Sequence, residues 1–96
     1  GERIYLNMTV NDLMIGQEGV IEGNPEILIS ALGTDKIDLI EILRNEEIIH
    51  CFHGTSADES RIFVDVKWNG EATFYRCRLT QRNGERAWTS PVWVSR

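Results

Sequence analysis

Apolar and polar residues alternate along most of this chain, and a period of two predicts β-strands that each place one face on a core. The alternation is clear near the N-terminus and again in residues 61–67 and 73–79. Its apolar members there are Ile4, Leu6, Met8 and Val10, then Ile62, Val64 and Val66, then Tyr75, Cys77 and Leu79. The pattern predicts a chain built mainly from strands.

Seven strands follow from the complete pattern. They are predicted at residues 3–10, 27–32, 36–44, 47–52, 61–67, 73–79 and 87–94, with loops at 15–26 and 53–60. Asn83 and Gly84 predict the hairpin turn before the last strand, which Pro91 interrupts. The buried face of the second strand stays open, because Ile27 and Leu28 begin two competing apolar rows. The expected fold class is all-β, a single immunoglobulin-like or fibronectin type III-like antiparallel β-sandwich over residues 1–96.

One segment, residues 37–44, carries two conflicting signals. Ile37, Ile40 and Leu43 have helical spacing, and the surrounding sequence "IDLIEILRNEEII" is rich in good helix formers. Against a helix stand the β-branched isoleucines, the neighbouring strands and the run "RNEE" at a position suited to a hairpin turn. We therefore predict two strands joined by that turn.

Composition limits the classes of function. The chain has 96 residues, enough for one domain, and a net charge of −5, which argues against a nucleic acid partner. It has no apolar run of the roughly 18 residues that a membrane-spanning helix needs. The first residues, "GERIYL", do not resemble a signal peptide, and strand patterns reach almost to both ends. We expect a module cut from a longer protein, located in the cytoplasm or outside it.

Charge is unevenly distributed along the sequence. Residues 1–60 hold twelve acidic and three basic residues, whereas residues 61–96 hold three acidic and seven basic residues. Because the two halves of a sandwich interleave, this asymmetry predicts ion pairs across strands rather than a bipolar surface.

The sequence predicts no catalytic residue, metal ligand or cofactor. His50, Cys51 and His53 are metal-ligating types, but the two histidines of one strand would point to opposite faces. Cys51 and Cys77 are expected to be free buried thiols, because another strand would separate theirs. Asp58 and Glu59 are predicted to be solvated turn residues.

The triplet Tyr75-Arg76-Cys77 resembles the tyrosine corner of immunoglobulin-like domains. There, the tyrosine hydroxyl donates a hydrogen bond to the connection that precedes its strand, which here would be "KWNGEAT". The cysteine and the tryptophan that disulfide-bonded immunoglobulin domains carry on two earlier strands are absent. The resemblance implies this architecture without its disulfide.

A second resemblance covers residues 27–94 and is most specific near the end. The tail "FYRCRLTQRNGERAWTSPVWV" is similar to the closing motif of a small β-sandwich that follows the catalytic domain of bacterial PHP-type metal-dependent phosphoesterases. The run "KIDLIEILRNEEIIHCF" also resembles a strand pair of that module. The resemblance implies a non-catalytic accessory domain that packs against such an enzyme, whose metal ligands lie upstream.

One surface is a candidate for binding a partner. Alternation places three residues of the strand 73–79 on its outward side, near two tryptophans of the last strand; the candidate residues are Phe74, Arg76, Arg78, Trp88 and Trp93. Tryptophan and arginine are enriched in the parts of interfaces that contribute most to binding. We expect this face to dock the neighbouring domain or a protein partner. The alternatives are that Arg76 and Arg78 pair with Glu41, or that the three tryptophan rings bind carbohydrate or protein.

Overall fold

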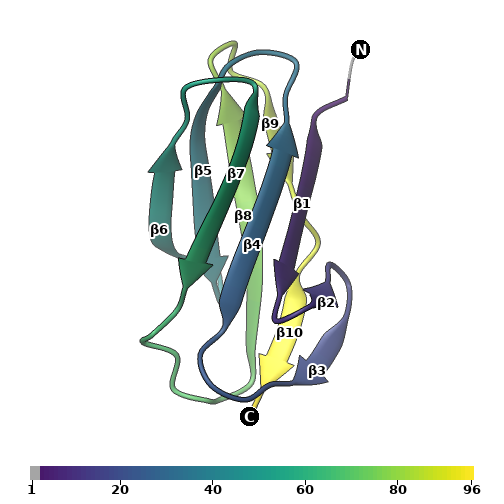
Figure 1. Ribbon diagram of the computed structural model, residues 1–96, viewed down its shortest axis with the longest axis vertical. Coiled ribbons are helices and arrows are strands. Elements are labelled where there is room, and N and C mark those ends of the chain that lie inside the picture. Colours follow the sequence, from purple (N-terminus) through teal and green to yellow (C-terminus); the bar gives the residue numbers. More distant parts are fainter. Residues whose placement is uncertain (1–2) are drawn as a thin grey trace.

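The computed structural model describes residues 3–96, which form two packed β-sheets and no helix (Figure 1). The strands are β1 (Tyr5–Val10), β2 (Leu13–Met14), β3 (Glu18–Val20), β4 (Glu26–Leu32), β5 (Ile37–Arg44), β6 (Glu47–His53), β7 (Asp58–Val64), β8 (Thr73–Gln81), β9 (Arg86–Trp88) and β10 (Val92–Ser95). Within the described range there is no long apolar helix of the kind that spans a membrane.

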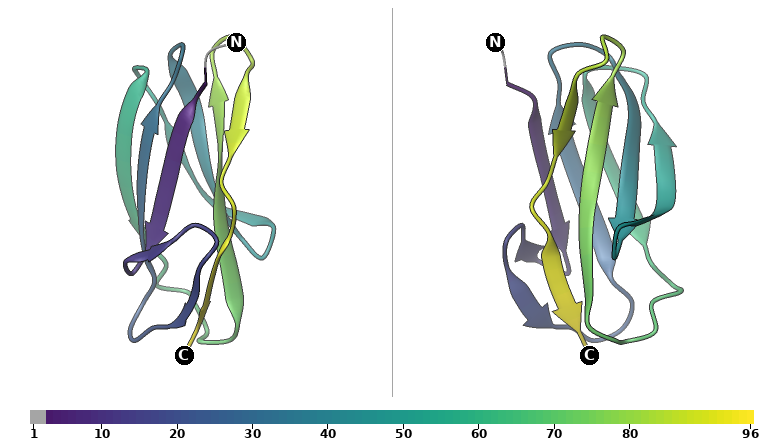
Figure 2. Two further views of the ribbon diagram at one scale, coloured as in Figure 1. Left: turned by 90° about the vertical axis from the view of Figure 1, so that its right-hand side faces the viewer. Right: turned by 180° about the vertical axis from the view of Figure 1, so that it is seen from behind.

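The two sheets lie face to face as the layers of a sandwich, and Figure 2 shows them edge-on. Sheet A has the strand order β2-β1-β4-β7, and sheet B has the order β3-β10-β8-β5-β6, with β9 also paired to β8. The predicted all-β sandwich is confirmed. The last predicted strand is divided into β9 and β10 around Pro91, as its position suggested.

Strand β3 lies inside the predicted loop 15–26, so that prediction was wrong there. Its three residues pair with β10 in parallel, with Glu18 opposite Trp93, which makes the sandwich not purely antiparallel. A three-residue strand with Gly19 at its centre has no alternation to detect, and its pairing partner lies more than 70 residues later in the sequence.

Residues 37–44 form a strand, not a helix. The turn that follows has positive φ at both Asn45 (49°) and Glu46 (70°), the pattern of a type I′ hairpin turn. Ile40 and Ile42 point into the core, and both are almost fully buried. Tertiary pairing with β6 and β8 on both sides therefore outweighs the local helix propensity.

The open choice of face in β4 is settled by burial: Ile27, Ile29 and Ala31 face the core, and Leu28 and Leu32 face outward. In β7 and the two residues after it, the faces are the reverse of those expected from the apolar row. Ile62, Val64 and Val66 are exposed, while Arg61, Phe63 and Asp65 point toward the interior.

Glu59 is buried in β7, which begins at Asp58 inside the predicted loop 53–60, so the prediction of a solvated turn was wrong for Glu59. The backbone N–H groups of Thr55 and Ser56 donate to its Oε1 at 2.8 and 3.0 Å, and Arg61 pairs with it at 2.6 Å. These donors, the Thr55 N–H first, hold the pKa of Glu59 below its ordinary value. The carboxylate caps the loop that leads into the strand.

The core lies between the sheets, and β8 supplies its centre. It comprises Met8, Val10, Ile21, Ile27, Ile29, Ala31, Ile37, Ile40, Ile42, Trp68, Tyr75, Cys77, Leu79, Val92 and Val94. Cys77 is fully buried, and burial raises the pKa of its thiol to about 12. Cys51 is exposed, which corrects the expectation of two buried thiols. Both cysteines are free, and β5 separates their strands as expected.

Tyr75 occupies the position of the tyrosine corner, and its hydroxyl donates to Asp65 Oδ2 at 2.6 Å. Asp65 lies in the connection between β7 and β8, as the resemblance implied, but two residues before the segment 67–73 in which the partner was expected. Arg44 Nη1 donates to both oxygens of the same carboxylate, at 2.9 and 2.7 Å, and the backbone N–H of Lys67 donates at 3.2 Å. Burial and the adjacent carboxylate raise the pKa of Tyr75, so the phenol stays protonated as a donor.

We expect Tyr75→Phe to lower the free energy of unfolding by about 1–3 kcal/mol, because it removes a donor from the buried Asp65 carboxylate. Urea denaturation followed by tryptophan fluorescence measures the loss. Tyr5→Phe is the matched control, because Tyr5 is 55% exposed, and it should change the free energy by no more than about 0.5 kcal/mol. Equal effects of the two substitutions would contradict this role for Tyr75.

Candidate interaction surface

The outward side of β8 carries the candidate residues in the predicted order. Tyr75, Cys77 and Leu79 point into the core, so alternation puts the intervening side chains on the outer face of sheet B. Trp88 lies opposite Arg78 in the pairing of β9 with β8, and Trp93 lies opposite Phe74 in the pairing of β10 with β8. We call the five residues Phe74, Arg76, Arg78, Trp88 and Trp93 the aromatic-arginine face.

The rings of this face are held by contacts with its other members. The Phe74 and Trp93 rings have centroids 4.8 Å apart at an interplanar angle of 45°. The guanidinium carbons of Arg76 and Arg78 lie 5.2 and 5.0 Å from the centre of the Trp88 ring, within the range of a cation-π interaction. Trp88 and Trp93 nevertheless remain 47% and 46% exposed. The structure thus presents two fixed, accessible tryptophans on one face.

Each arginine of the face also has a carboxylate partner. Arg78 Nε donates to Glu41 Oε1 at 2.7 Å, which is the predicted cross-strand pair. Arg76 pairs with Glu46 in the β5–β6 turn, not with Glu41. The hydrogen bond from Arg78 holds the pKa of the buried Glu41 below its ordinary value. These pairs fix the arginine side chains across the sheet.

Ion pairs also connect the acidic first half of the sequence with its basic second half. Three basic residues of the second half pair with acidic residues that are distant in the first half: Arg76 with Glu46, Arg78 with Glu41 and Arg82 with Asp35. Arg61 pairs instead with Glu59, two residues earlier in the same strand. The expected pairing of the two halves is therefore present. Glu46 could not be assigned from sequence, because its approach to β8 depends on the conformation of a turn.

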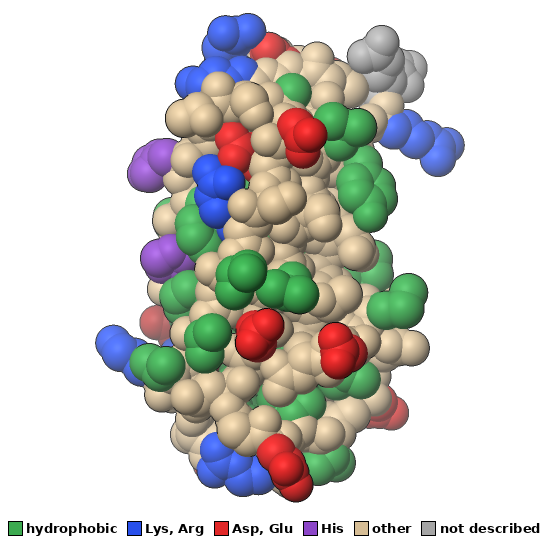
Figure 3. Space-filling model, viewed as in Figure 1, with side chains coloured by type: hydrophobic (Ala, Val, Ile, Leu, Met, Phe, Trp, Pro, Cys, Tyr) green, Lys and Arg blue, Asp and Glu red, His purple; other side chains and the backbone are tan. Residues whose placement is uncertain are grey.

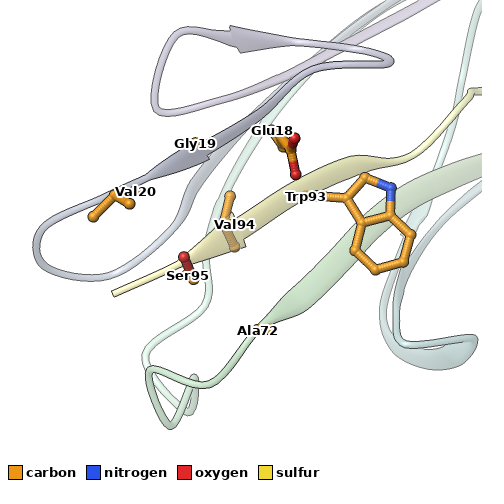
Figure 4. Close-up of a pocket in the computed structure, with 7 residues that line it drawn as sticks. All are labelled: Glu18, Gly19, Val20, Ala72, Trp93, Val94 and Ser95. Carbon is orange, nitrogen blue, oxygen red and sulfur yellow. The ribbon is translucent and has the colours of Figure 1, made fainter.

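An open depression of about 270 Å³ lies beside Trp93. Figure 4 shows it between β3, β10 and the start of β8, with Glu18 next to Trp93 and with Val20 at its outer rim. Val20 is 76% exposed. The aromatic-arginine face therefore continues into a small concave site with one carboxylate. Sequence analysis missed Glu18 because β3 itself was not predicted.

Trp68 does not belong to this surface. It is 6% exposed, and its Nε1–H donates to the Glu71 carbonyl at 3.1 Å and to Thr73 Oγ1 at 3.0 Å. Two of the three tryptophans considered for ligand binding are therefore on the surface, and the third is a core residue.

The three residues of β6 that could ligate a metal, His50, Cys51 and His53, do not converge. The ring of His50 stacks on Phe63 between the sheets, with centroids 4.5 Å apart, whereas Cys51 and His53 are exposed on the other side of the strand. Across residues 3–96, no three His, Cys, Asp or Glu side chains are grouped so that they could hold a metal ion.

Comparison with known proteins gives similarity to three chlamydial proteins. An uncharacterized protein of Chlamydia trachomatis is 32% identical over an alignment 111 positions long, which covers 98% of this chain and 18% of that protein. Uncharacterized proteins of Chlamydia muridarum and Chlamydia pneumoniae are 30% and 29% identical with the same coverage. The chain thus spans about a fifth of the length of these curated relatives. No protein-family model and no solved structure matches it.

Arg78→Ala should raise the pKa of Glu41 toward its ordinary range, because the hydrogen bond from Arg78 is the main cause of the lowered value. Carbon-13 NMR titration of the Glu41 carboxyl measures this change. Arg82→Ala is the control, since Arg82 pairs with Asp35. If the pKa of Glu41 is the same in both variants, the assigned pair is wrong.

The same pair gives a pH dependence of stability. The pKa of Glu41 is lower in the folded than in the unfolded chain, so the ionised carboxylate stabilises the fold. This contribution to the free energy of unfolding is complete above the unfolded-state pKa. The contribution is lost as the pH falls through the folded-state pKa. The difference in stability between wild type and Arg78→Ala should therefore shrink in acid.

Proposed function

We propose that this chain is a non-catalytic interaction domain of a longer bacterial protein, and that its aromatic-arginine face docks a protein partner. The observation that carries the proposal is the pair of half-exposed tryptophans, Trp88 and Trp93, fixed on one sheet by Arg76, Arg78 and Phe74. Tryptophan and arginine dominate binding energy at protein interfaces, and side chains already held in place lose less entropy on binding.

The state of the reactive side chains supports a non-catalytic role. Burial raises the pKa of Cys77 to about 12, so its thiol is not a nucleophile near neutral pH. His50 is packed against the rings of Phe52 and Phe63. Glu41 and Glu59 are held by the arginines beside them. These contacts give each group a structural role.

The proposed context is an immunoglobulin-like accessory module beside a PHP-type phosphoesterase domain. The strand order supports the immunoglobulin-like part, because β1-β4-β7 faces β6-β5-β8, with β9 and β10 paired to the other side of β8, and because a core tyrosine lies near the start of the inner row of β8. The phosphoesterase neighbour rests on the resemblance of residues 27–94. The greater length of the chlamydial relatives agrees with a multidomain parent.

The proposal is tested by purifying the tagged protein from its source bacterium and quantifying bound proteins by mass spectrometry. The double variant Trp88→Ala/Trp93→Ala should lose a specific partner that the wild type retains. Val66→Ala is the control, because Val66 is 70% exposed and lies outside the face. Thermal unfolding verifies that both variants are folded. Identical sets of bound proteins for all three chains would refute docking through this face.

Carbohydrate binding is the second candidate function, and the depression beside Trp93 favours it. An exposed indole next to the Glu18 carboxylate and the Ser95 hydroxyl offers a ring for a sugar to stack on and polar groups for its hydroxyls. A glycan array probed with the chain separates the candidates. Sugar binding should be lost in Trp93→Ala and Glu18→Gln and kept in Trp88→Ala, whereas protein docking requires Trp88 as well.

A further inference from the structure

The outer face of sheet A, which Figure 3 views, carries several exposed apolar side chains. We call the five large apolar residues on the outer side of β1, β4 and β7 the sheet A patch: Tyr5, Leu28, Leu32, Ile62 and Val64. Strand pairing arranges them in two groups, because Tyr5 lies opposite Leu32 at one end of β4 and Leu28 lies opposite Ile62 at the other. Their exposed fractions run from 38% for Leu28 to 65% for Ile62.

The remaining outward positions of these strands are mostly neutral. Asn7 and Thr9 in β1, and the paired Ser30 and Ser60 in β4 and β7, separate the apolar side chains. Leu28, Ser30, Ser60 and Ile62 also line an open hollow of about 480 Å³. The charged outward residues of β1, β4 and β7 are Glu26 and Asp58, which stand at opposite ends of the sheet.

Strand β7 shows that this arrangement is not simply a solvated sheet surface. Its isoleucine and valine, Ile62 and Val64, face outward, while Arg61 and Phe63 face the other sheet. A strand that needed to cover only one core would carry its β-branched residues on the inner side. Leu28, Ile62 and Val64 form one exposed apolar group, and Tyr5 and Leu32 form a second beyond the row of Asn7, Ser30 and Ser60. Exposed apolar groups with polar residues around them are typical of a surface that another protein surface covers.

We propose that the sheet A patch is the interface with a neighbouring domain of the same polypeptide, and that the aromatic-arginine face stays free for a separate partner. The inference rests on the proposed role as a domain of a longer protein. The chlamydial relatives align with 98% of this chain, yet the aligned part is 18% of their length, so most of each relative lies outside it.

The chemistry of the patch fits a tethered neighbour. Interfaces between domains of one chain mix apolar and neutral polar residues, as this patch does. A tether also supplies an effective concentration on the order of millimolar, so neither steering charge nor aromatic anchors are required. The aromatic-arginine face has the opposite character, with the anchor residues expected of an interface that binds a separate molecule.

The test uses thiol alkylation in the full natural protein that carries residues 1–96. Native Cys51 is exposed on the outer face of sheet B and reports that face. The variant Cys51→Ser/Ile62→Cys places the reactive thiol on the sheet A patch instead. Buried Cys77 should stay unreactive in both proteins, which verifies the fold. The 96-residue chain alone gives the intrinsic rate at each position.

We expect the thiol at position 62 to react at least about ten-fold more slowly in the full protein than in the 96-residue chain, as for an interface open less than a tenth of the time. Cys51 should react at the same rate in both. If position 62 reacts equally in both, the patch faces solvent and the inference is wrong, while docking through Trp88 and Trp93 still stands.

The other outcomes also overturn the inference. Protection of Cys51 instead of position 62 would show that the neighbour covers sheet B. Protection in the 96-residue chain that grows with protein concentration, together with sedimentation as a dimer, would identify a second copy as the occupant. A natural protein that ends with these residues would remove the neighbour altogether, and with it the proposed accessory role.

Discussion

The buried Asp65 carboxylate is the interaction on which the arrangement of the two sheets depends. Asp65 directly follows β7 of sheet A, while its partners Arg44 and Tyr75 belong to β5 and β8 of sheet B. The cluster therefore joins the sheets at one end, and it fixes the inward direction of Tyr75. Because side chains alternate along a strand, this also fixes Phe74 and Arg76 on the outer face. The Asp65 cluster thus determines which side chains of β8 enter the core and which lie on the candidate surface.

Sequence periodicity was enough to identify most strands, because a half-buried strand leaves a local signal of period two. It failed where the signal is not local. Strand β3 depends on a parallel pairing with β10, and Glu59 is buried because loop N–H groups converge on it. In β7 the apolar row of Ile62 and Val64 was found, but which side of the strand faces the core is set by the other sheet.

The candidate surface was predictable in part for the same reason. Alternation along β8 correctly placed Phe74, Arg76 and Arg78 together. It could not tell the buried Trp68 from the exposed Trp88, because exposure depends on packing among distant segments. Alternation also could not identify partners of this surface that lie in turns, such as Glu46, which pairs with Arg76. Two surfaces of contrasting chemistry emerge from the fold, one rich in tryptophan and arginine and one apolar and neutral.

The central claim is that the core and the Asp65 cluster stabilise the fold, whereas the exposed tryptophans contribute little to its stability. Urea unfolding of three alanine variants tests it most directly. Trp68→Ala should lower the free energy of unfolding by about 3–5 kcal/mol, because it opens a cavity in the core. Trp88→Ala and Trp93→Ala should each cost about 1–1.5 kcal/mol or less, the worth of their exposed ring contacts. A loss in Trp88→Ala as large as that in Trp68→Ala would contradict the claim.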